Sequence, residues 1–382
     1  MEPGASIVIV TYNSESTIED CIKSVLATLR LQDEVIIIDN ASTDRTLPLI
    51  KNLIQPNDQI KILPQEENLG FSRGCNLGIA NSTKEFIILL NPDTEVFGDW
   101  IERLMSHFYL YPSTGAVGPL TNYAIRSQLI ITYFPEYYDY IHRVYDLLDT
   151  LAQRYSRRSI PAKLLTGFCL MLQRRTLDQI GWLDESIYLG DDDLELAWRL
   201  RENGYYLRLA LDVFINHVGH VSFQSLGKKE EKSVIQEGSN VLLEKMKSYY
   251  HPDKIPHPLD YFGIDWWKPS ILEYEPWEKY FAPNHTRKYF NEQIQGIKTL
   301  VKKHAFQEAI EMINRLLKIH VNNFMLWYIL GSIYLHLHDF KNAEFALKNA
   351  WALEFSSQRA EKKLKLLYSK WRRNDFAKIM EI

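Results

Sequence analysis

The chain has 382 residues, of which 46% are hydrophobic and 24% are charged, and its formal net charge is −4. This composition is typical of a globular protein, and the length exceeds one ordinary core, so we expect two domains. The slightly acidic balance argues against a general nucleic-acid binder. No stretch approaches the roughly 20 apolar residues that cross a bilayer, and no basic segment opens the chain. We therefore expect a cytoplasmic protein without a transmembrane segment.

The three cysteines lie far apart in the sequence. Cys21, Cys75 and Cys169 each fall inside a predicted apolar segment. Their spacing fits neither a zinc site nor a disulfide framework. We expect buried thiols in a reducing compartment.

Short apolar runs alternate with amphipathic segments in the first hundred residues. The runs are of strand length and rich in Ile and Val, and they cover residues 6–10, 35–39, 60–63 and 86–90. Helical patterns cover residues 16–30, 45–54 and 72–81. Runs that are apolar at every position are typical of strands buried on both faces. The alternation predicts an α/β fold, with βαβ units and an open sheet covered by helices.

The middle of the chain is less regular. Residues 112–165 contain a tyrosine-rich stretch flanked by prolines, and we expect an insertion with partial helix. A strand is predicted at 167–173 and a helix at about 192–203. A strand pair is predicted at 206–210 and 213–215, and it leads to His217.

The C-terminal third changes character. Residues 250–290 are rich in proline and aromatic residues, which excludes long helices and predicts an ordered connector or a docking surface. From 291 to 382 the pattern is amphipathic helix, and the last helix is expected at about 358–371. Small and aromatic residues recur there at the offsets of a tetratricopeptide repeat: Trp327, Leu330, Gly331, Tyr334, Ala343, Leu347 and Ala350, with Ala309, Ile313 and Leu316 one period earlier. We expect an all-α domain that resembles such repeats, with the number of repeats left open.

Polar clusters follow three of the predicted strands, at the point where each strand ends. The clusters are Thr11-Tyr12-Asn13, Asp39-Asn40-Ala41-Ser42 and Asn91-Pro92-Asp93-Thr94. In open α/β sheets, ligands bind at the carboxyl ends of the strands. Any one cluster is explained by the polar turn that follows a strand, but three at equivalent places predict one shared site.

Seven motifs in a fixed order resemble the family 2 glycosyltransferases of GT-A fold, inverting and rhamnosyltransferase-like. They are IVTYNSESTIEDCIKSV, VIIIDNASTDRT, ENLGFSRGCNLGI, LLNPDTEV, TGFCLMLQRR, DDDLELAWRLRENGY and NHVGHVS. The resemblance covers roughly residues 5–225, and we place the glycosyltransferase domain at 1–249. It implies a Rossmann-like mixed sheet with helices on both faces, a nucleotide-sugar donor, a divalent metal and transfer of a sugar to an acceptor hydroxyl. The insertion at 112–165 would then lie on the acceptor side.

The resemblance implies that Thr11, Tyr12 and Asp39 hold the nucleoside, and we place Asn13 in the same group. The residue chemistry agrees, because a carboxylate accepts a hydrogen bond from the imide N–H of uracil or thymine, which cytosine and adenine lack. Asp39 therefore favours a UDP- or dTDP-sugar, and a guanine nucleotide stays open. The alternative for Asp39 is a turn former together with Asn40.

A glycine-containing segment at 68–74 precedes a predicted helix. The backbone at Asn68 and Gly70 is free to approach a ligand, and a helix N-terminus favours anions. Arg73 adds charge-assisted hydrogen bonds to the diphosphate of the donor. The alternative for Arg73 is a surface salt bridge.

Asn91-Pro92-Asp93 stands where the family has its Asp-X-Asp metal motif, with an amide in place of the first carboxylate. Mg²⁺ needs only one or two carboxylates plus substrate phosphates, so Asp93 and the diphosphate suffice for Mg²⁺ or Mn²⁺. The lost charge at Asn91 predicts weaker metal affinity. The resemblance implies a second metal or phosphate contact from His217, with His220 as the weaker candidate, and the alternative is a structural histidine.

Three consecutive aspartates, Asp191-Asp192-Asp193, stand at the start of a predicted helix. One carboxylate caps a helix, and three exceed what capping needs. Aligned on the family's Glu-Asp pair, Asp193 is the catalytic base and Asp192 supports the acceptor site, while the reverse assignment stays open. Asp191 takes the capping or supporting role, and Glu195 pairs with Arg199 on the helix surface.

The acceptor is less defined than the donor. Helical repeats present concave surfaces that bind extended peptides, so we expect a protein acceptor, such as a bacterial surface or flagellar protein, docked by the C-terminal domain. A polysaccharide or lipid-linked oligosaccharide is the alternative. The repeats could instead serve stability or homo-oligomerisation. A different class of function is an inactive nucleotide-sugar-binding adaptor, which Asn91 favours and the intact Asp93, Asp193 and His217 oppose.

Overall fold

The structure is a computed structural model in which residues 3–54, 59–124, 127–137, 143–219, 228–251, 255–263, 287–354 and 358–371 are described. The chain divides into two compact units. The first unit comprises residues 1–157 and 164–245, and the second comprises residues 158–163 and 246–382.

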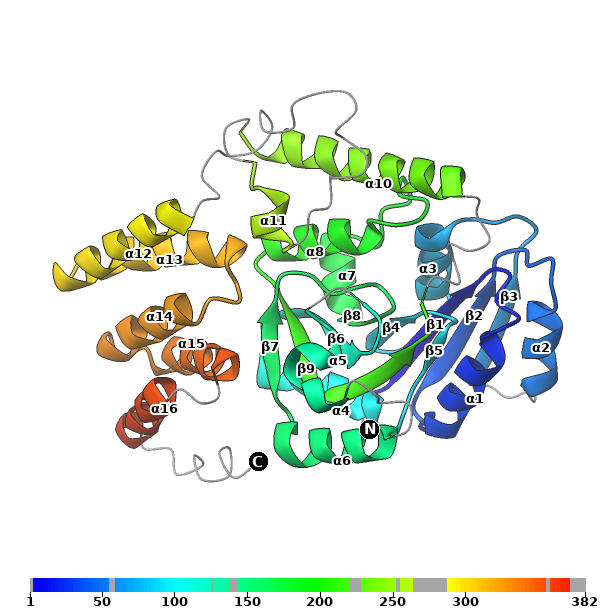
Figure 1. The fold of residues 1–382 in the computed structure, drawn as a ribbon, viewed down its shortest axis with the longest axis horizontal. Coiled ribbons are helices and arrows are strands. Elements are labelled where there is room, and N and C mark those ends of the chain that lie inside the picture. Colours follow the sequence, from blue (N-terminus) through cyan, green and yellow to red (C-terminus); the bar gives the residue numbers. More distant parts are fainter. Residues whose placement is uncertain are drawn as a thin grey trace. The chain divides into compact units, whose positions relative to one another are not determined.

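A mixed β-sheet forms the centre of the first unit (Figure 1). Its strands are β1 (Ala5–Thr11), β2 (Glu34–Asp39), β3 (Ile60–Pro64), β4 (Phe86–Leu90), β5 (Thr94–Glu95), β6 (Thr114–Thr121), β8 (Cys169–Gln173) and β9 (Tyr206–His217). They lie in the order β3-β2-β1-β4-β8-β6-β9-β5. The pairs β3–β2, β2–β1 and β1–β4 are parallel. β8 is antiparallel to both β4 and β6, and β6 is parallel to β9. The predicted mixed α/β fold is confirmed.

Helices cover both faces of this sheet (Figure 1). They are α1 (Ile18–Thr28), α2 (Thr46–Leu53), α3 (Phe71–Ala80), α4 (Trp100–Leu110), α5 (Ile130–Tyr133), η1 (Pro135–Tyr137), α6 (Val144–Tyr155), α7 (Arg174–Ile180) and α8 (Asp192–Glu202). On β1, Ile7 and Ile9 share one buried cluster with Ile18 and Ile22 of α1. The alternate residues Val8 and Val10 face α3 instead. Both faces of the strand are therefore buried, which explains why its sequence is apolar throughout.

α3 packs unusually close to β1. A Cβ atom added at Gly78 would lie 2.2 Å from Val8 Cγ1, and one added at Gly74 would lie 2.8 Å from Val10 Cγ1. The side-chain amide of Asn40, just after β2, donates to the carbonyl of Gly70 at 3.0 Å. Two small residues on one helix face thus bring the N-terminus of α3 beside the ends of β1 and β2.

The second unit is largely helical. Its elements are β7 (Ser159–Ala162), α11 (Pro258–Tyr261), α12 (Arg287–Lys302), α13 (Phe306–Ile319), α14 (Phe324–His336), α15 (Phe340–Leu353) and α16 (Gln358–Trp371). Each helix from α12 to α16 packs against the next one in the chain. His304 and His338, 34 positions apart, precede α13 and α15 and share a left-handed backbone with φ of 59° and 61°. The expected C-terminal helical region is confirmed, and its assignment to the tetratricopeptide class stays a prediction.

Three features of the first unit differ from the sequence expectations. Residues 114–121, placed in the insertion 112–165, form the buried strand β6; the two glycines and one proline of TGAVGPLT conceal it because both residue types are depleted in strands. Residues 206–217 form the single strand β9 and not a pair. Asp212, a residue type depleted in strands, lies buried within β9. Its Oδ1 lies 2.9 Å from His107 Nε2, and its Oδ2 accepts from the Arg157 N–H at 2.7 Å. α4 was not predicted.

Some of the predicted segments lie outside the described residues, and one helix spans both units. α10 (Lys228–Tyr249) runs from the first unit into the second. Most of the predicted connector 250–290 and a part of the tyrosine-rich insertion lie outside the described residues, as does His220. All three cysteines are buried, as expected, and none forms a disulfide.

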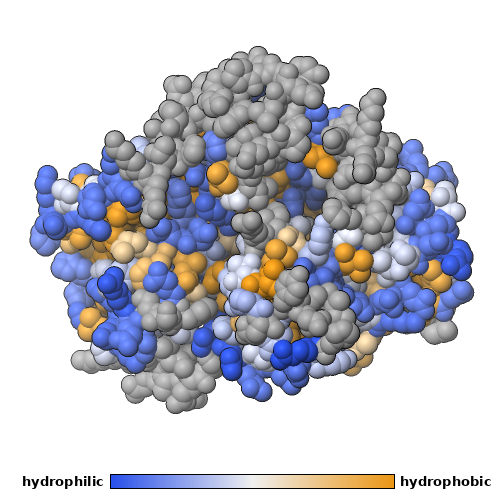
Figure 2. Space-filling view, in the orientation of Figure 1, coloured by the Kyte–Doolittle hydropathy of each residue, from blue (hydrophilic) through white to orange (hydrophobic). Residues whose placement is uncertain are grey.

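The surface carries single large apolar side chains on several elements. Figure 2 shows a face on which hydrophilic residues surround small groups of hydrophobic ones. Leu31, after α1, and Tyr145, on α6, are the most exposed of the large apolar side chains, at 93% and 75%. No described helix combines the length and the apolar character needed to cross a membrane.

The close packing of α3 predicts the effect of a single methyl group. An alanine in place of a helical glycine ordinarily stabilises a protein by up to about 1 kcal/mol. Overpacking a core costs about 1–3 kcal/mol, and Val8, only 1% exposed, has no room to move. We therefore expect Gly78→Ala to lower the midpoint of thermal unfolding.

Gly296→Ala, in α12, is the matched control, because the added Cβ would meet Met312 only at 3.5 Å. Its unfolding midpoint should stay unchanged or rise. A midpoint for Gly78→Ala equal to that of the parent chain would contradict the close approach of α3 to β1.

Candidate active site

The ends of β1 and β2 form the first part of the site. Thr11 and Asp39 are paired in register, and both are buried. One carboxylate oxygen of Asp39 accepts from the Ser42 N–H at 3.3 Å. Its other oxygen, Oδ1, and Thr11 Oγ1 have no hydrogen-bond partner among the described residues. Buried polar atoms without partners are costly, so these two oxygens mark a place where a ligand can donate.

Asn13 has a different environment. Its backbone has a φ of 48°, and its N–H donates to Ser42 Oγ at 3.0 Å. The side-chain oxygen accepts from the Thr43 N–H at 2.8 Å. Asn13 thus holds the loop after β1 against the loop after β2, beside the half-buried Tyr12.

The segment before α3 makes a tight turn that depends on glycine. Asn68 Oδ1 accepts from the Gly70 N–H at 2.9 Å and tightens the turn. Gly70 has a φ of 80°, and a Cβ atom there would lie 2.6 Å from the Tyr188 ring. Only glycine therefore fits this position without strain. Ser72 Oγ, in the first turn of α3, is buried without a hydrogen-bond partner among the described residues.

Arg73 does not reach into this segment in the structure. Its Nε lies 3.3 Å from Glu185 Oε2, and both side chains are about half exposed. This is the surface salt bridge that the sequence left as the alternative. An exposed pair of this kind contributes about 0–1 kcal/mol, so a diphosphate could compete for the guanidinium.

Asp93 and His217 form the second part of the site. Asp93 follows β4, and register pairing of Thr94 with His217 holds the two residues side by side. His217 Nε2 lies 3.4 Å from Asp93 Oδ1, which is buried and has no hydrogen-bond partner in the described part of the chain. His217 Nδ1 lies 2.7 Å from the carbonyl oxygen of Tyr123.

This geometry fixes the tautomer of His217. A carbonyl oxygen only accepts, so Nδ1 carries the proton and the neutral ring has its lone pair on Nε2. That lone pair faces a carboxylate oxygen, and two such groups repel one another unless a second ring proton or a metal cation lies between them. The pair therefore fits a divalent metal ion, and the Nδ1 contact is the orienting bond that metal-ligating histidines usually make.

Asn91 takes part through its backbone. Its N–H donates to the Phe168 carbonyl at 2.9 Å, and its carbonyl accepts from Thr94 Oγ1 at 2.8 Å. Across the described ranges, no third His, Cys, Asp or Glu joins Asp93 and His217. A metal ion here would need further ligands besides these two side chains.

The segment at the start of β8 joins the metal pair to the aspartate cluster. The Phe168 ring stacks on the His217 ring, with 4.9 Å between the ring centroids. The Tyr123 ring packs edge-on against the same imidazole, with 5.6 Å between the centroids. The Gly167 N–H donates to Asp193 Oδ2 at 3.1 Å. Two consecutive residues therefore contact both halves of the candidate site.

Asp192 and Asp193 lie in the first turn of α8, half-buried. Burial raises the pKa of both carboxyls above the ordinary range, and the charge of Asp191 raises both further. The charge of Asp192 also raises the pKa of Asp193, and the pKa of Asp193 rises more than that of Asp192. A carboxylate with a raised pKa is a better proton acceptor near neutral pH.

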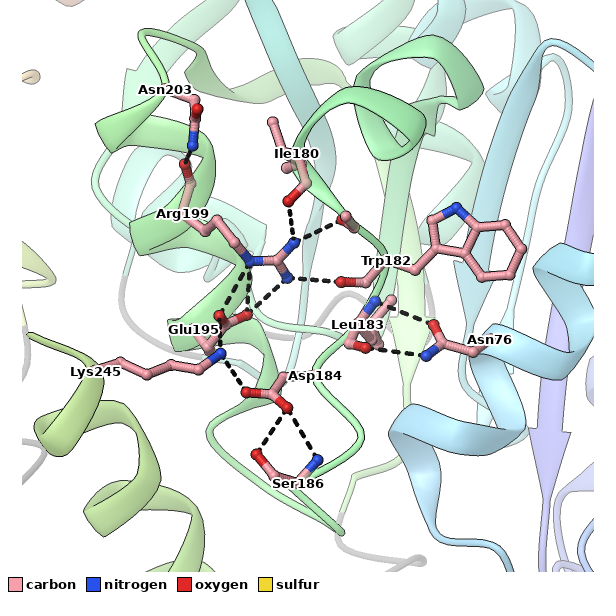
Figure 3. A network of polar contacts seen from close by, with 11 residues as sticks. Asn76, Ile180, Trp182, Leu183, Asp184, Ser186, Glu195, Arg199, Asn203 and Lys245 are labelled. Atoms are coloured by element: carbon pink, nitrogen blue, oxygen red, sulfur yellow. Dashed lines mark hydrogen bonds and ion pairs between the residues drawn. The ribbon is translucent and has the colours of Figure 1, made fainter. Parts of the chain in front are cut away.

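Two details of the cluster differ from the sequence expectations. Asp191 stands at the N-cap of α8 with a φ of 61°, but among the described residues its side chain makes no capping hydrogen bond; it accepts from the Ser239 hydroxyl. Glu195 and Arg199 pair at 2.7 Å, as predicted, but Glu195 is only 1% exposed and the pair is not on the surface. Arg199 also donates to three consecutive carbonyls at the end of α7 and the start of the following loop (Figure 3).

Sequence reasoning missed several residues of this region. Thr166 and Phe168 stand in the motif TGFCLMLQRR, which signalled the family but not their positions. Thr166 Oγ1 is buried without a hydrogen-bond partner among the described residues. Asn76 stands in the motif ENLGFSRGCNLGI, which likewise did not reveal its contact with Leu183, and Lys245 stands in no motif; the contacts of both residues lie far away in the sequence.

Comparisons with known proteins agree with this geometry. Residues 6–180 match the profile of Glycosyl transferase family 2. The poly-beta-1,6-N-acetyl-D-glucosamine synthase of Staphylococcus aureus strain COL is 26% identical over 205 residues, which are 54% of this chain and 47% of that protein. The chain thus spans about half the length of the curated relatives that it matches.

Solved structures are also similar to the chain. Staphylococcus aureus TarS 1–349 is 14% identical, with 91% of this chain and 90% of that chain covered and a TM-score of 0.47. The mannosyltransferase PcManGT from Pyrobaculum calidifontis, in complex with GDP-Man and Mn²⁺, is 18% identical, with 68% and 67% covered and a TM-score of 0.45. The profile match assigns residues 6–180, which include the strand ends of β1, β2 and β4, to a glycosyl transferase family 2 domain.

Proposed function

We propose that the chain is an inverting glycosyltransferase that moves a sugar from a nucleotide diphosphate to an acceptor hydroxyl. The observation that carries this proposal is a set of buried oxygens without partners among the described residues, at the ends of neighbouring strands of a family 2 domain. They are Thr11 Oγ1, Asp39 Oδ1 and Asp93 Oδ1. Each needs a donor or a cation, and a metal-bound nucleotide diphosphate supplies both.

Asp39 selects the nucleobase in this proposal. Its available oxygen accepts from the imide N–H of uracil or thymine, and CDP, which has no such group, is the matched control ligand. We expect UDP with Mn²⁺ to raise the unfolding midpoint of the chain more than CDP does. Asp39→Asn should weaken UDP binding about tenfold or more, because a hydrogen bond to a charged group is worth about 1.5–3 kcal/mol.

Calorimetry with UDP, dTDP, GDP and CDP measures this preference. Asp20→Asn, an exposed residue of α1, is the control variant and should bind UDP as the parent chain does. Equal affinity for UDP and CDP in the parent chain would rule out the assigned role of Asp39. The name of the Staphylococcus aureus relative makes UDP-N-acetylglucosamine the first sugar donor to test.

Asp93 and His217 would hold a divalent metal ion, Mg²⁺ or Mn²⁺, together with the diphosphate. When bound, such an ion neutralises charge that develops on the leaving diphosphate. Asn91 keeps the turn in place through its backbone and contributes no charge. We therefore propose that metal binding is weak without the nucleotide.

Removal of the metal ion tests this assignment. We expect EDTA to stop release of UDP from the sugar donor, and added Mg²⁺ or Mn²⁺ to restore it. Asn91→Asp should lower the Mn²⁺ concentration that gives half the maximal rate, because a second carboxylate strengthens the site. Asp93→Asn should abolish the metal response, and an undiminished rate in EDTA would mean that the site works without metal.

Asp193 is the general base in the proposed reaction. It takes the proton from the acceptor hydroxyl as that oxygen attacks the anomeric carbon, and the bond to the diphosphate breaks. The sugar passes through an oxocarbenium-like transition state and its configuration inverts, without a covalent intermediate. Asp192 supports the acceptor side, and the Gly167 N–H orients the carboxylate of Asp193.

Asp193→Asn should reduce transfer about 10²–10⁴-fold, the usual contribution of a general base, and leave calorimetric binding of UDP unchanged. Because the pKa of Asp193 is raised, its carboxylate form is lost as the pH falls through that higher value. We expect kcat/KM to keep rising with pH well above 3.9, where an ordinary aspartate titrates. A rate that is flat from about pH 5 upward would contradict the base assignment.

The acceptor has two candidates. The helices α12 to α16, with their recurring 34-residue spacing, support a protein acceptor docked on the second unit. The name of the Staphylococcus aureus relative supports a glycan acceptor instead. The chain is incubated with a radiolabelled sugar donor and candidate acceptors, and the product is treated with protease. Label that protease releases identifies a protein acceptor, and label that resists protease identifies a glycan. An inactive adaptor would bind UDP and release none from any sugar donor.

A further inference from the structure

One face of α10 packs on the turn that carries the catalytic aspartates. A Cβ atom added at Gly238 would lie 2.8 Å from the Gly190 carbonyl oxygen, so the helix backbone and the turn nearly touch. The Ser239 hydroxyl donates to Asp191, and the Leu242 side chain is fully buried. Residues three, four and seven apart lie on one helix face, so the next residue of this face is Lys245.

Lys245 lies between two carboxylates of different elements (Figure 3). Its ammonium contacts Glu195 Oε1 of α8 at 2.7 Å and forms a second ion pair with Asp184 in the preceding loop. Burial lowers the pKa of Lys245, but hydrogen bonds to Asp184 and Glu195 outweigh it and the net shift is upward. Lys245 is therefore charged near neutral pH, and it ties the loop to the helix.

The loop at 181–190 is fixed on its other side by α3. Asn76 exchanges two hydrogen bonds with the backbone of Leu183, at 2.9 and 3.0 Å, as Figure 3 shows. The Phe71 N–H, in the first turn of α3, donates to the Tyr188 carbonyl at 2.8 Å. The loop thus connects the helix whose N-terminus would face the diphosphate to the turn that begins α8.

We propose that Lys245 is a positioning residue for sugar transfer, which holds the loop 181–190 and the first turn of α8 so that Asp193 keeps its place relative to α3. This inference rests on the proposed function of Asp193. Small displacements of a reacting group, on the order of 1 Å, can cost about 10²-fold in rate. Loss of Lys245 would also leave the buried Glu195 with Arg199 as its remaining partner in the network of Figure 3.

Three variants of the full chain test the proposal. Lys245→Met keeps the length of the side chain and removes its charge, Lys245→Arg keeps the charge, and Lys51→Met changes an exposed lysine of α2 as the matched control. Asp184→Asn is a milder change, which weakens the tie to the loop and keeps Glu195 paired; it replaces Lys245→Met if that variant does not fold.

Hydrogen exchange at the amides of residues 181–193 is the first measurement. We expect about tenfold faster exchange in Lys245→Met than in the parent chain, with near-parent protection in Lys245→Arg and Lys51→Met. The second measurement is release of UDP from UDP-N-acetylglucosamine, or from whichever sugar donor the nucleotide panel selects. We expect kcat to fall about tenfold in Lys245→Met at unchanged KM for the donor, and Lys245→Arg to restore it.

Unchanged exchange in Lys245→Met would overturn the proposal. A rise in KM with kcat unchanged would also overturn it, as would a fall in kcat that matches the loss of folded protein and is not restored by arginine. Failure of the proposed function is a separate outcome: the parent chain would then not bind UDP with Mn²⁺ in calorimetry. The exchange measurement needs neither donor nor acceptor, so in either case it decides whether Lys245 holds the loop 181–190.

Discussion

Parallel pairing of β1 with β2 on one side and with β4 on the other determines where a ligand can meet this chain. Thr11 opposes Asp39 at the end of the first pair. Pairing of Ile9 with Leu90 brings the turn after β4 to the same edge. The strand interiors are apolar and buried on both faces, so polar side chains can face a ligand only where the strands end. The candidate site is therefore built at this edge of the sheet.

The parallel half of the fold was readable from the sequence because buried parallel strands are uniform apolar runs and their polar ends mark themselves. The other half was readable only in part: the strand β8 was predicted, but β6, which carries glycine and proline, was missed, and β9, which carries a buried aspartate, was predicted as two strands. The candidate residues at the strand ends came from the same local signal. The roles of Asn76, Phe168 and Lys245 could not be predicted in this way. They depend on contacts with residues far away in the sequence, which neither spacing nor composition encodes.

The site gathers negative charge. Asp39, Asp93 and the aspartates at the start of α8 belong to it. Two cationic side chains near these residues already pair with other carboxylates: Arg73 with Glu185, and Lys245 with Glu195 and Asp184. Burial and mutual repulsion raise the pKa of Asp192 and Asp193 as a result. Under the proposed function, compensating positive charge arrives with the substrate, so nucleotide and metal bind as one unit and the base acts beside them.

The buried cysteines have a practical consequence. Cys21 lies behind the Asn91 turn, where its thiol contacts the Asn91 carbonyl oxygen at 3.6 Å, and burial raises its pKa to about 12. Burial likewise raises the pKa of Cys75 and Cys169. Thiols of this kind stay protonated and do not react with alkylating reagents in the folded chain. A cysteine introduced at an exposed position would then be the one site that accepts a fluorescent label, with the native sequence otherwise intact.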